Sequence, residues 1–92
     1  MKYVIVISEE NHGFIAVAKD MKSAFQYLLL KNWITKTEVF IVDGVAYFLE
    51  ELQELYEQTT LLDTLLLLWE VDEDLFDGLF SFSKEEIFET NA

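Results

Sequence analysis

A long stretch in the second half of the chain combines acidic and apolar residues without a single basic one. Residues 38–83 hold twelve Asp and Glu residues, no Lys, Arg or His, and many Leu, Phe, Tyr and Trp residues. Because an unpaired carboxylate is costly to bury, these side chains must face solvent, pair with the other half of the chain, or meet a partner. The stretch therefore predicts amphipathic elements with anionic outer faces.

The formal net charge of −12 is divided unevenly along the 92 residues. Residues 1–36 hold five Lys and three acids, whereas residues 37–92 hold one Lys and fifteen acids. The field of such a molecule repels phosphate, so we expect a protein partner with a basic surface and no direct nucleic-acid binding. All six cations are Lys, and the lack of Arg and Pro is typical of an AT-rich source such as a low-GC bacterium or its phages.

Length and composition limit the class of protein. A chain of 92 residues, 52% of them hydrophobic, predicts a single domain over residues 1–92 with ample material for a core. The absence of Cys removes disulfides and thiolate catalysis and fits a reducing compartment, and the first residues contain no signal-peptide core. The apolar run 61–71 is far shorter than the roughly 20 residues that span a bilayer. We therefore expect a cytoplasmic protein that does not contact a membrane.

Apolar runs separated by turn residues predict two β-hairpins with a helix between them. The four strands are expected over residues 3–7, 14–18, 38–42 and 45–48. Asp43-Gly44 is a strong hairpin signal, because a type I′ turn needs positive φ at both positions. Asp20 is placed to cap a helix over residues 21–32 that ends at Asn32. The unbroken apolar run of residues 3–7 is typical of a strand buried on both faces.

Helical segments are expected after the second hairpin. Residues 48–57 fit an amphipathic helix with an anionic outer face. Residues 61–71, capped by Thr60, fit a helix that is apolar nearly all round, which implies that it is buried on most sides or contacts another chain. Asp72 is placed to cap a short helical turn that ends at Phe76.

The end of the chain allows two interpretations. Residues 79–82 are expected to add an edge strand, and residues 84–90 fit either a helix opened by a capping box at Ser83 or a continued strand. The order ββαββ followed by helical segments predicts an α+β fold. We expect a small, mainly antiparallel sheet from the two hairpins, covered by helices, with a helical C-terminal half.

No residue pattern indicates catalysis, a cofactor or a metal centre. His12 is the only histidine, and the three glycines are scattered singly, so no catalytic triad or phosphate-binding loop is recognisable. A calcium loop with Gly78 as its sixth residue would place Leu75 and Lys84 at the third and twelfth positions, where carboxylates are needed. We therefore expect a non-enzymatic protein without a cofactor or metal.

Two surfaces are the candidate sites for partners. An acidic face is expected to bind a protein, and it consists of Glu50, Glu51, Glu54, Glu57, Asp72, Glu73, Asp74 and Asp77. The apolar helix is expected to form a homodimer contact through Leu62, Leu65, Leu66 and Trp69. The main interpretation is a small acidic binding or assembly protein, encoded by a phage or mobile element.

The alternative interpretation is a nucleic-acid mimic. Duplex DNA carries about one negative charge per 1.7 Å of its axis, so about 25 Å of duplex holds on the order of fifteen charges, similar to the acidic half of this chain. In size and charge the chain resembles the small acidic inhibitors that phages use against host nucleases. This resemblance implies an inhibitor that occupies the basic groove of a nucleic-acid-processing protein.

Overall fold

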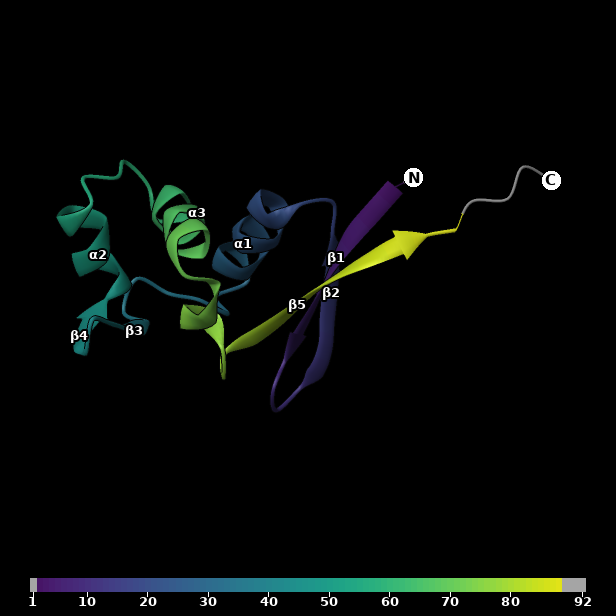
Figure 1. The fold of residues 1–92 in the computed structure, drawn as a ribbon, viewed down its shortest axis with the longest axis horizontal. Helices are drawn as coiled ribbons and strands as arrows, with labels where there is room; N and C mark the ends of the chain where they lie inside the picture. Colours follow the sequence, from purple (N-terminus) through teal and green to yellow (C-terminus); the bar gives the residue numbers. More distant parts are fainter. Residues whose placement is uncertain (1, 89–92) are drawn as a thin grey trace.

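The computed structural model of the protein describes residues 2–88 (Figure 1). The elements in chain order are β1 (Lys2–Glu9), β2 (Gly13–Ala18), α1 (Met21–Leu30), β3 (Val39–Val42), β4 (Val45–Phe48), α2 (Leu49–Leu55), α3 (Leu61–Val71), the 3₁₀ turn η1 (Glu73–Phe76) and β5 (Phe80–Ile87). This order confirms the α+β class and both expected hairpins. Among residues 2–88, no helix has the length and apolarity that crossing a membrane requires.

The strands form two antiparallel sheets. In the first, β1 lies between β2 and β5, and the second contains only β3 and β4. The two hairpins therefore do not share a sheet, and the third strand of the larger sheet comes from the C-terminal part of the chain. β5 pairs with β1 along its whole length, from Phe80 opposite Glu9 to Ile87 opposite Lys2. Of the two interpretations of residues 84–90, the pairing with β1 shows that residues 84–87 form a strand and not a helix. Residues 89 and 90 lie outside the described part.

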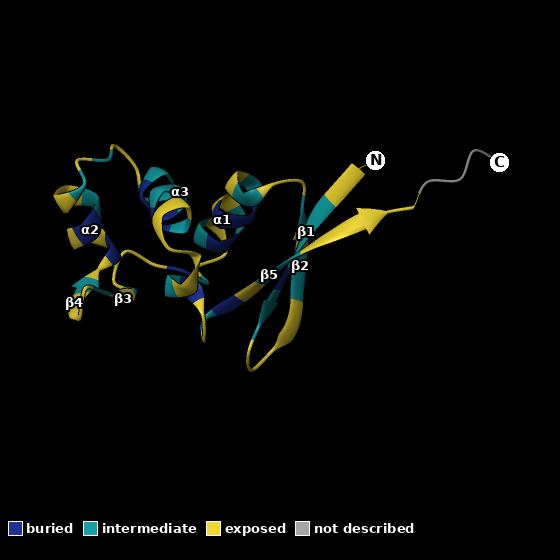
Figure 2. Ribbon diagram, in the orientation of Figure 1, coloured by how far each residue is buried: buried dark blue, intermediate teal, exposed yellow. Residues whose placement is uncertain are grey.

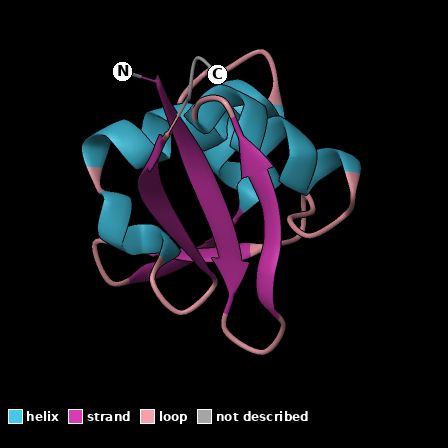
Figure 3. Ribbon diagram, turned by 90° about the vertical axis from the view of Figure 1, so that its right-hand side faces the viewer, coloured by secondary structure: helices cyan, strands magenta, loops and turns pink. Residues whose placement is uncertain are grey.

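The helices gather on one face of the three-stranded sheet (Figure 3). Ile7 of β1 points to this face and is fully buried, whereas Val17 of β2 is 52% exposed. The expected burial of residues 3–7 on both faces is wrong, because Tyr3 is 44% exposed and only Ile7 of this run is fully buried. An apolar run alone does not reveal how many faces the rest of the chain covers.

Aromatic side chains from distant parts of the sequence form the centre of the core. Phe25 of α1 packs against Phe76 and Phe82 with ring centroids 5.1 and 5.4 Å apart, and Phe76 also packs against Phe40 of β3 at 5.4 Å. Figure 2 shows the buried residues where α1, α2 and α3 lie next to one another. Phe76 thus joins the β3–β4 hairpin to the helices and to β5.

Local signals in the sequence set the ends of the helices. The Asp20 carboxylate accepts a hydrogen bond from the Ser23 N–H at 2.7 Å, and the Thr60 hydroxyl accepts one from the Asp63 N–H at 3.0 Å. Asn32 follows α1 with φ of 60°, and Asp43 and Gly44 have φ of 51° and 80°. These caps and the type I′ turn confirm the predictions made from the same residues.

Candidate functional site

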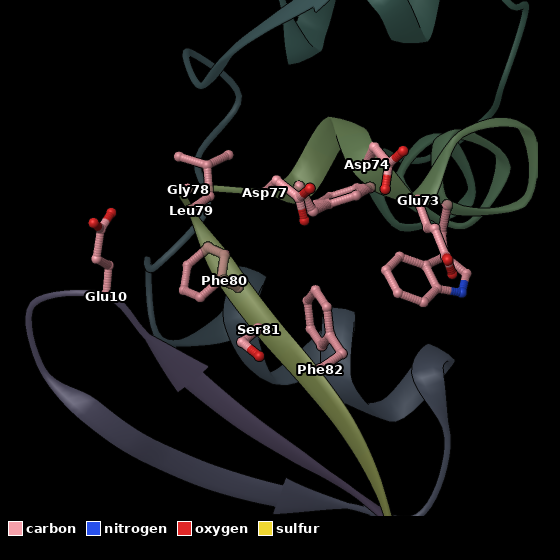
Figure 4. Close-up of a pocket in the computed structure, with 11 residues that line it drawn as sticks. Glu10, Glu73, Asp74, Asp77, Gly78, Leu79, Phe80, Ser81 and Phe82 are labelled. Atoms are coloured by element: carbon pink, nitrogen blue, oxygen red, sulfur yellow. The ribbon is translucent and has the colours of Figure 1, made fainter.

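A groove of about 510 Å³ lies beside the start of β5 (Figure 4). Its walls come from the C-terminal end of α3, from η1 and the turn after it, from β5, and from the loop between β1 and β2. The lining residues are Glu10, Trp69, Glu73, Asp74, Phe76, Asp77, Gly78, Leu79, Phe80, Ser81 and Phe82. Segments that are far apart in the sequence therefore meet at this groove.

Aromatic rings form the floor of the groove. Trp69 packs edge-on against Phe82 with ring centroids 5.2 Å apart, and Phe80 lies 6.3 Å from Phe82. Phe76 is 1% exposed and Phe80 8%, so the main chain and neighbouring rings hold both side chains in place. The half-buried Trp69, Leu79 and Phe82 supply the accessible apolar surface of the floor, and the buried Phe76 and Phe80 support it from beneath.

Carboxylates surround this floor. The four acidic residues of the lining are all exposed, and they are Glu10, Glu73, Asp74 and Asp77. The lining contains no Lys, Arg or His, and within residues 2–88 no lysine forms an ion pair with these four carboxylates. The groove therefore combines an apolar floor with an uncompensated anionic rim.

Two turns place the acidic rim. Asp72 caps η1 by accepting a hydrogen bond from the Asp74 N–H at 3.1 Å, and Gly78 then turns the chain into β5 with φ of 83°. Positive φ at this position favours glycine, because other side chains clash with the main chain there. The acids at 73, 74 and 77 are thereby held on the turn that borders the groove.

The loop between β1 and β2 brings Glu10 to the groove. Next to it, the Glu9 carboxylate accepts hydrogen bonds from the N–H groups of Asn11 and His12 at 3.0 and 2.9 Å, and it lies 2.7 Å from the His12 ring nitrogen Nδ1. The His12 ring contact, followed by these main-chain bonds, lowers the pKa of Glu9. The His12 ring also packs edge-on against Trp33, with ring centroids 5.0 Å apart. Contacts of His12 with Glu9 and with Trp33 therefore hold the loop in place.

Comparison with protein-family models, with curated proteins and with solved structures finds no match for this chain.

The structure divides the eight acids of the expected partner-binding face between two places. Glu73, Asp74 and Asp77 line the groove, and Asp72 caps η1. The other four lie exposed on α2 or just after it, away from the groove lining, and they are Glu50, Glu51, Glu54 and Glu57. Glu51 also accepts a hydrogen bond from the Phe48 N–H at 3.0 Å, which gives it a structural role at the start of α2.

The apolar residues expected to form a dimer contact are largely used inside the chain. Leu65 is fully buried, so it has no surface to offer a second chain, and this assignment is corrected by the packing of α3 against α1 and α2. Leu62, Leu66 and Trp69 are half-buried and pack against the core. Trp69 contributes instead to the floor of the groove.

A second groove of about 450 Å³ lies on the other side of η1. Six apolar and aromatic side chains and two Asp residues line it, namely Ile41, Val42, Asp43, Tyr56, Leu67, Val71, Asp72 and Leu75. Ile41 and Val71 are 56% and 64% exposed, so much of this apolar lining faces solvent.

Within residues 2–88, no three acidic or histidine side chains converge closely enough to hold a metal ion.

Sequence reasoning did not place Glu10, Ser81 or the two Phe residues of β5 at a binding site. Glu10 belongs to the half of the chain whose net charge is positive, and Glu9 is the only other acidic residue within residues 1–19. It reaches the groove because β5 pairs with β1, which sets Phe80 opposite Glu9. Only a long-range pairing carries this information, so no local signal could have found it.

Proposed function

We propose that this protein is a non-enzymatic binding protein whose groove holds a cationic segment of a protein partner. The observation that supports the proposal most directly is the combination of an aromatic floor with four exposed carboxylates and no basic residue in the lining. A Lys or Arg side chain matches both features, because its aliphatic stem can cover the rings while its charged end stays in water beside the carboxylates. A guanidinium or ammonium group over Trp69 would gain a further cation–π attraction.

The expected affinity is modest and sensitive to salt. Exposed ion pairs contribute about 0.2–1 kcal/mol each, so three or four of them add only about 0.6–4 kcal/mol to binding. Salt screens such pairs, since the Debye length falls from about 10 Å at 0.1 M to about 3 Å at 1 M. Most of the specificity would then come from the charge of the rim, and the floor would add apolar contact that salt does not weaken.

The test uses a fluorescently labelled peptide in which Lys alternates with Val. Its binding is followed by fluorescence anisotropy at about 0.05 M and about 0.5 M NaCl. In a triple variant, Glu73→Gln, Asp74→Asn and Asp77→Asn, we expect the affinity at low salt to fall about tenfold, which corresponds to about 1.4 kcal/mol.

The matched control removes the same charge elsewhere. Glu50→Gln, Glu54→Gln and Glu57→Gln remove three negative charges, as many as the rim variant loses. These residues lie outside the groove. We expect this variant to bind the peptide within about twofold of the native chain, because only the rim contacts the peptide. Equal weakening by the two triple variants would show that the peptide responds to overall charge and would refute the groove as its site.

A second candidate function is a nucleic-acid mimic that blocks a basic groove of a nucleic-acid-processing protein. The exposed acids on and after α2 support it, because a mimic needs many carboxylates on an accessible surface. The same variants separate the two functions. A mimic that uses the whole acidic half should lose affinity for a basic nucleic-acid enzyme in both triple variants, whereas a groove-bound segment should depend on the rim alone.

A further inference from the structure

We propose that the cationic segment binds as an added β-strand along the free edge of β5. The inference rests on the proposed function, since it concerns the same groove and the same class of partner. Within residues 2–88, β5 pairs only with β1, so one of its edges has no strand beside it. Such an edge presents N–H and C=O groups that an extended segment can bind.

Part of the groove borders this edge of β5. Phe80 and Phe82 lie opposite Glu9 and Ile7 of β1, and Ser81 lies opposite Ser8. Because successive side chains of a strand point to opposite faces, Ser81 points away from the face that holds the two Phe rings. Ser81 nevertheless lines the groove together with the two Phe residues, and Figure 4 shows Glu73 and Asp74 on the side of β5 that faces away from β1. A segment lying in the groove is thus placed beside the unpaired groups of β5.

The part of the edge next to the groove carries no charge. Residues 80–83 read Phe-Ser-Phe-Ser, whereas Lys84, Glu85 and Glu86 follow in the same strand. Charged side chains on an edge strand disfavour pairing with a further strand. The uncharged part of β5 and the groove therefore coincide, and pairing is expected over residues 80–83 and not further along the strand.

The charge around the edge selects the occupant. A second copy of this chain would bring its own acidic rim and a net charge of −12, so edge-to-edge pairing of two copies is repelled. An extended segment with Lys or Arg at every second position places its cations on one side, about 6.6–6.8 Å apart, where they can face the rim. The other edge of the sheet is formed by β2, which contributes no residue to the groove lining. A cationic segment at that edge would therefore not face the acidic rim.

The experiment compares peptides that differ only in which main-chain N–H groups they can donate. Two versions of the alternating Lys-Val peptide carry N-methyl groups on alternate residues, one version on the Lys positions and the other on the Val positions. Only every second N–H of a strand points towards a given neighbour, so one version loses its bonds to β5 and the other keeps them. The two versions have equal charge and equal methylation, so each is the control for the other.

We expect one methylated version to bind the native chain at least about tenfold more weakly than the unmethylated peptide, and the other to stay within about threefold. Backbone amide hydrogen exchange in residues 80–83 should slow on binding of the unmethylated peptide. Equal binding of the two methylated versions would overturn strand addition while leaving the groove as the binding site. Failure of the unmethylated peptide to bind would instead overturn the proposed function, and strand addition with it.

Discussion

The two grooves on either side of η1 are similar in volume but differ in what they offer a partner. One has an acidic rim and an aromatic floor, and the other is mainly aliphatic, with volumes of about 510 and 450 Å³. The short segment between them supplies both. Glu73 and Asp74 of η1 line the acidic groove, and Leu75 of the same turn lines the aliphatic one. A single helical turn thus sorts neighbouring side chains into two surfaces of different chemistry.

The supports of the two grooves also differ. The floor of the acidic groove belongs to the aromatic cluster around Phe25, and it adjoins the three-stranded sheet. The aliphatic groove takes Ile41, Val42 and Asp43 from the β3–β4 hairpin, whose sheet has only two strands. Two-stranded hairpins are marginal in water without packing against other elements. We therefore expect the acidic groove to be the more rigid of the two, as suits a preformed binding site.

The largest predicted effect comes from removing a ring that lines the acidic groove and packs against Phe40 of β3. Phe76 is 1% exposed and contacts Phe25, Phe40 and Trp69. Phe76→Ala should lower the free energy of unfolding by about 3–5 kcal/mol, a large part of the about 5–15 kcal/mol typical of a small domain. Urea unfolding followed by circular dichroism measures the loss. Val71→Ala, at a site 64% exposed, is the control and should change stability by less than about 1 kcal/mol.

A loss of about 1 kcal/mol is expected when the cap of α3 is removed. Thr60→Ala eliminates the hydrogen bond from its hydroxyl to the Asp63 N–H. Because α3 supplies Trp69 to one groove and Leu67 to the other, its loosening should affect both grooves together. Thr37→Ala, which removes only an exposed hydrogen bond with the Thr35 hydroxyl outside the helices, is the control. Equal stability of the Thr60→Ala variant and the native chain would show that the cap does not hold the grooves.

Added salt should stabilise the protein by a smaller amount. Fifteen acids lie within residues 37–92, and their mutual repulsion weakens when ions screen it. We expect the Tm to rise between about 0.02 M and about 0.5 M NaCl, by a few degrees at most. The rise should be smaller in the variant with three neutralised rim acids. A Tm that falls over this range would contradict repulsion among the carboxylates.

The smallest effect concerns Glu38, just before the hairpin that supports the aliphatic groove. Burial raises the pKa of Glu38 above its ordinary value, because the charged form is less well solvated in the folded chain. The ionised side chain therefore costs stability at neutral pH, and this cost disappears as the pH falls through the raised pKa. Glu38→Gln should raise the Tm slightly at pH 7. At acidic pH the Tm of the native chain should equal that of the variant. A Glu38→Gln variant less stable than the native chain at pH 7 would oppose this interpretation.

Local features of the fold could be predicted from the sequence, because neighbouring residues determine them. The turn at Asp43-Gly44 and the caps at Asp20 and Thr60 depend on φ preferences and on hydrogen bonds within three residues. Ser83 shows the limit of such signals. Ser83 and the residues after it fit the start of a helix, yet they pair with β1 and form a strand. The Ser83 hydroxyl donates a hydrogen bond to the Glu85 carboxylate instead of capping a helix.

The candidate site could be predicted only in part, for the same reason. The composition predicts that the acids at 73, 74 and 77 belong to an acidic face, and the apolar helix predicts a dimer contact at Trp69. Bringing them together with Glu10 and Phe80 requires the β1–β5 pairing, which joins residues about seventy positions apart in the chain. The burial of Leu65 likewise depends on how α3 packs against two other helices.

The most direct test is a map of amide chemical shifts in ¹H–¹⁵N spectra of the native chain during titration with the alternating Lys-Val peptide. If the acidic groove is the binding site, the largest shifts will fall on Glu10 and on residues 69–82, and the amides of residues 50–57 will stay nearly unchanged. If the largest shifts instead fall on residues 50–57 or on the β3–β4 hairpin, the acidic groove is not where this protein binds a cationic segment.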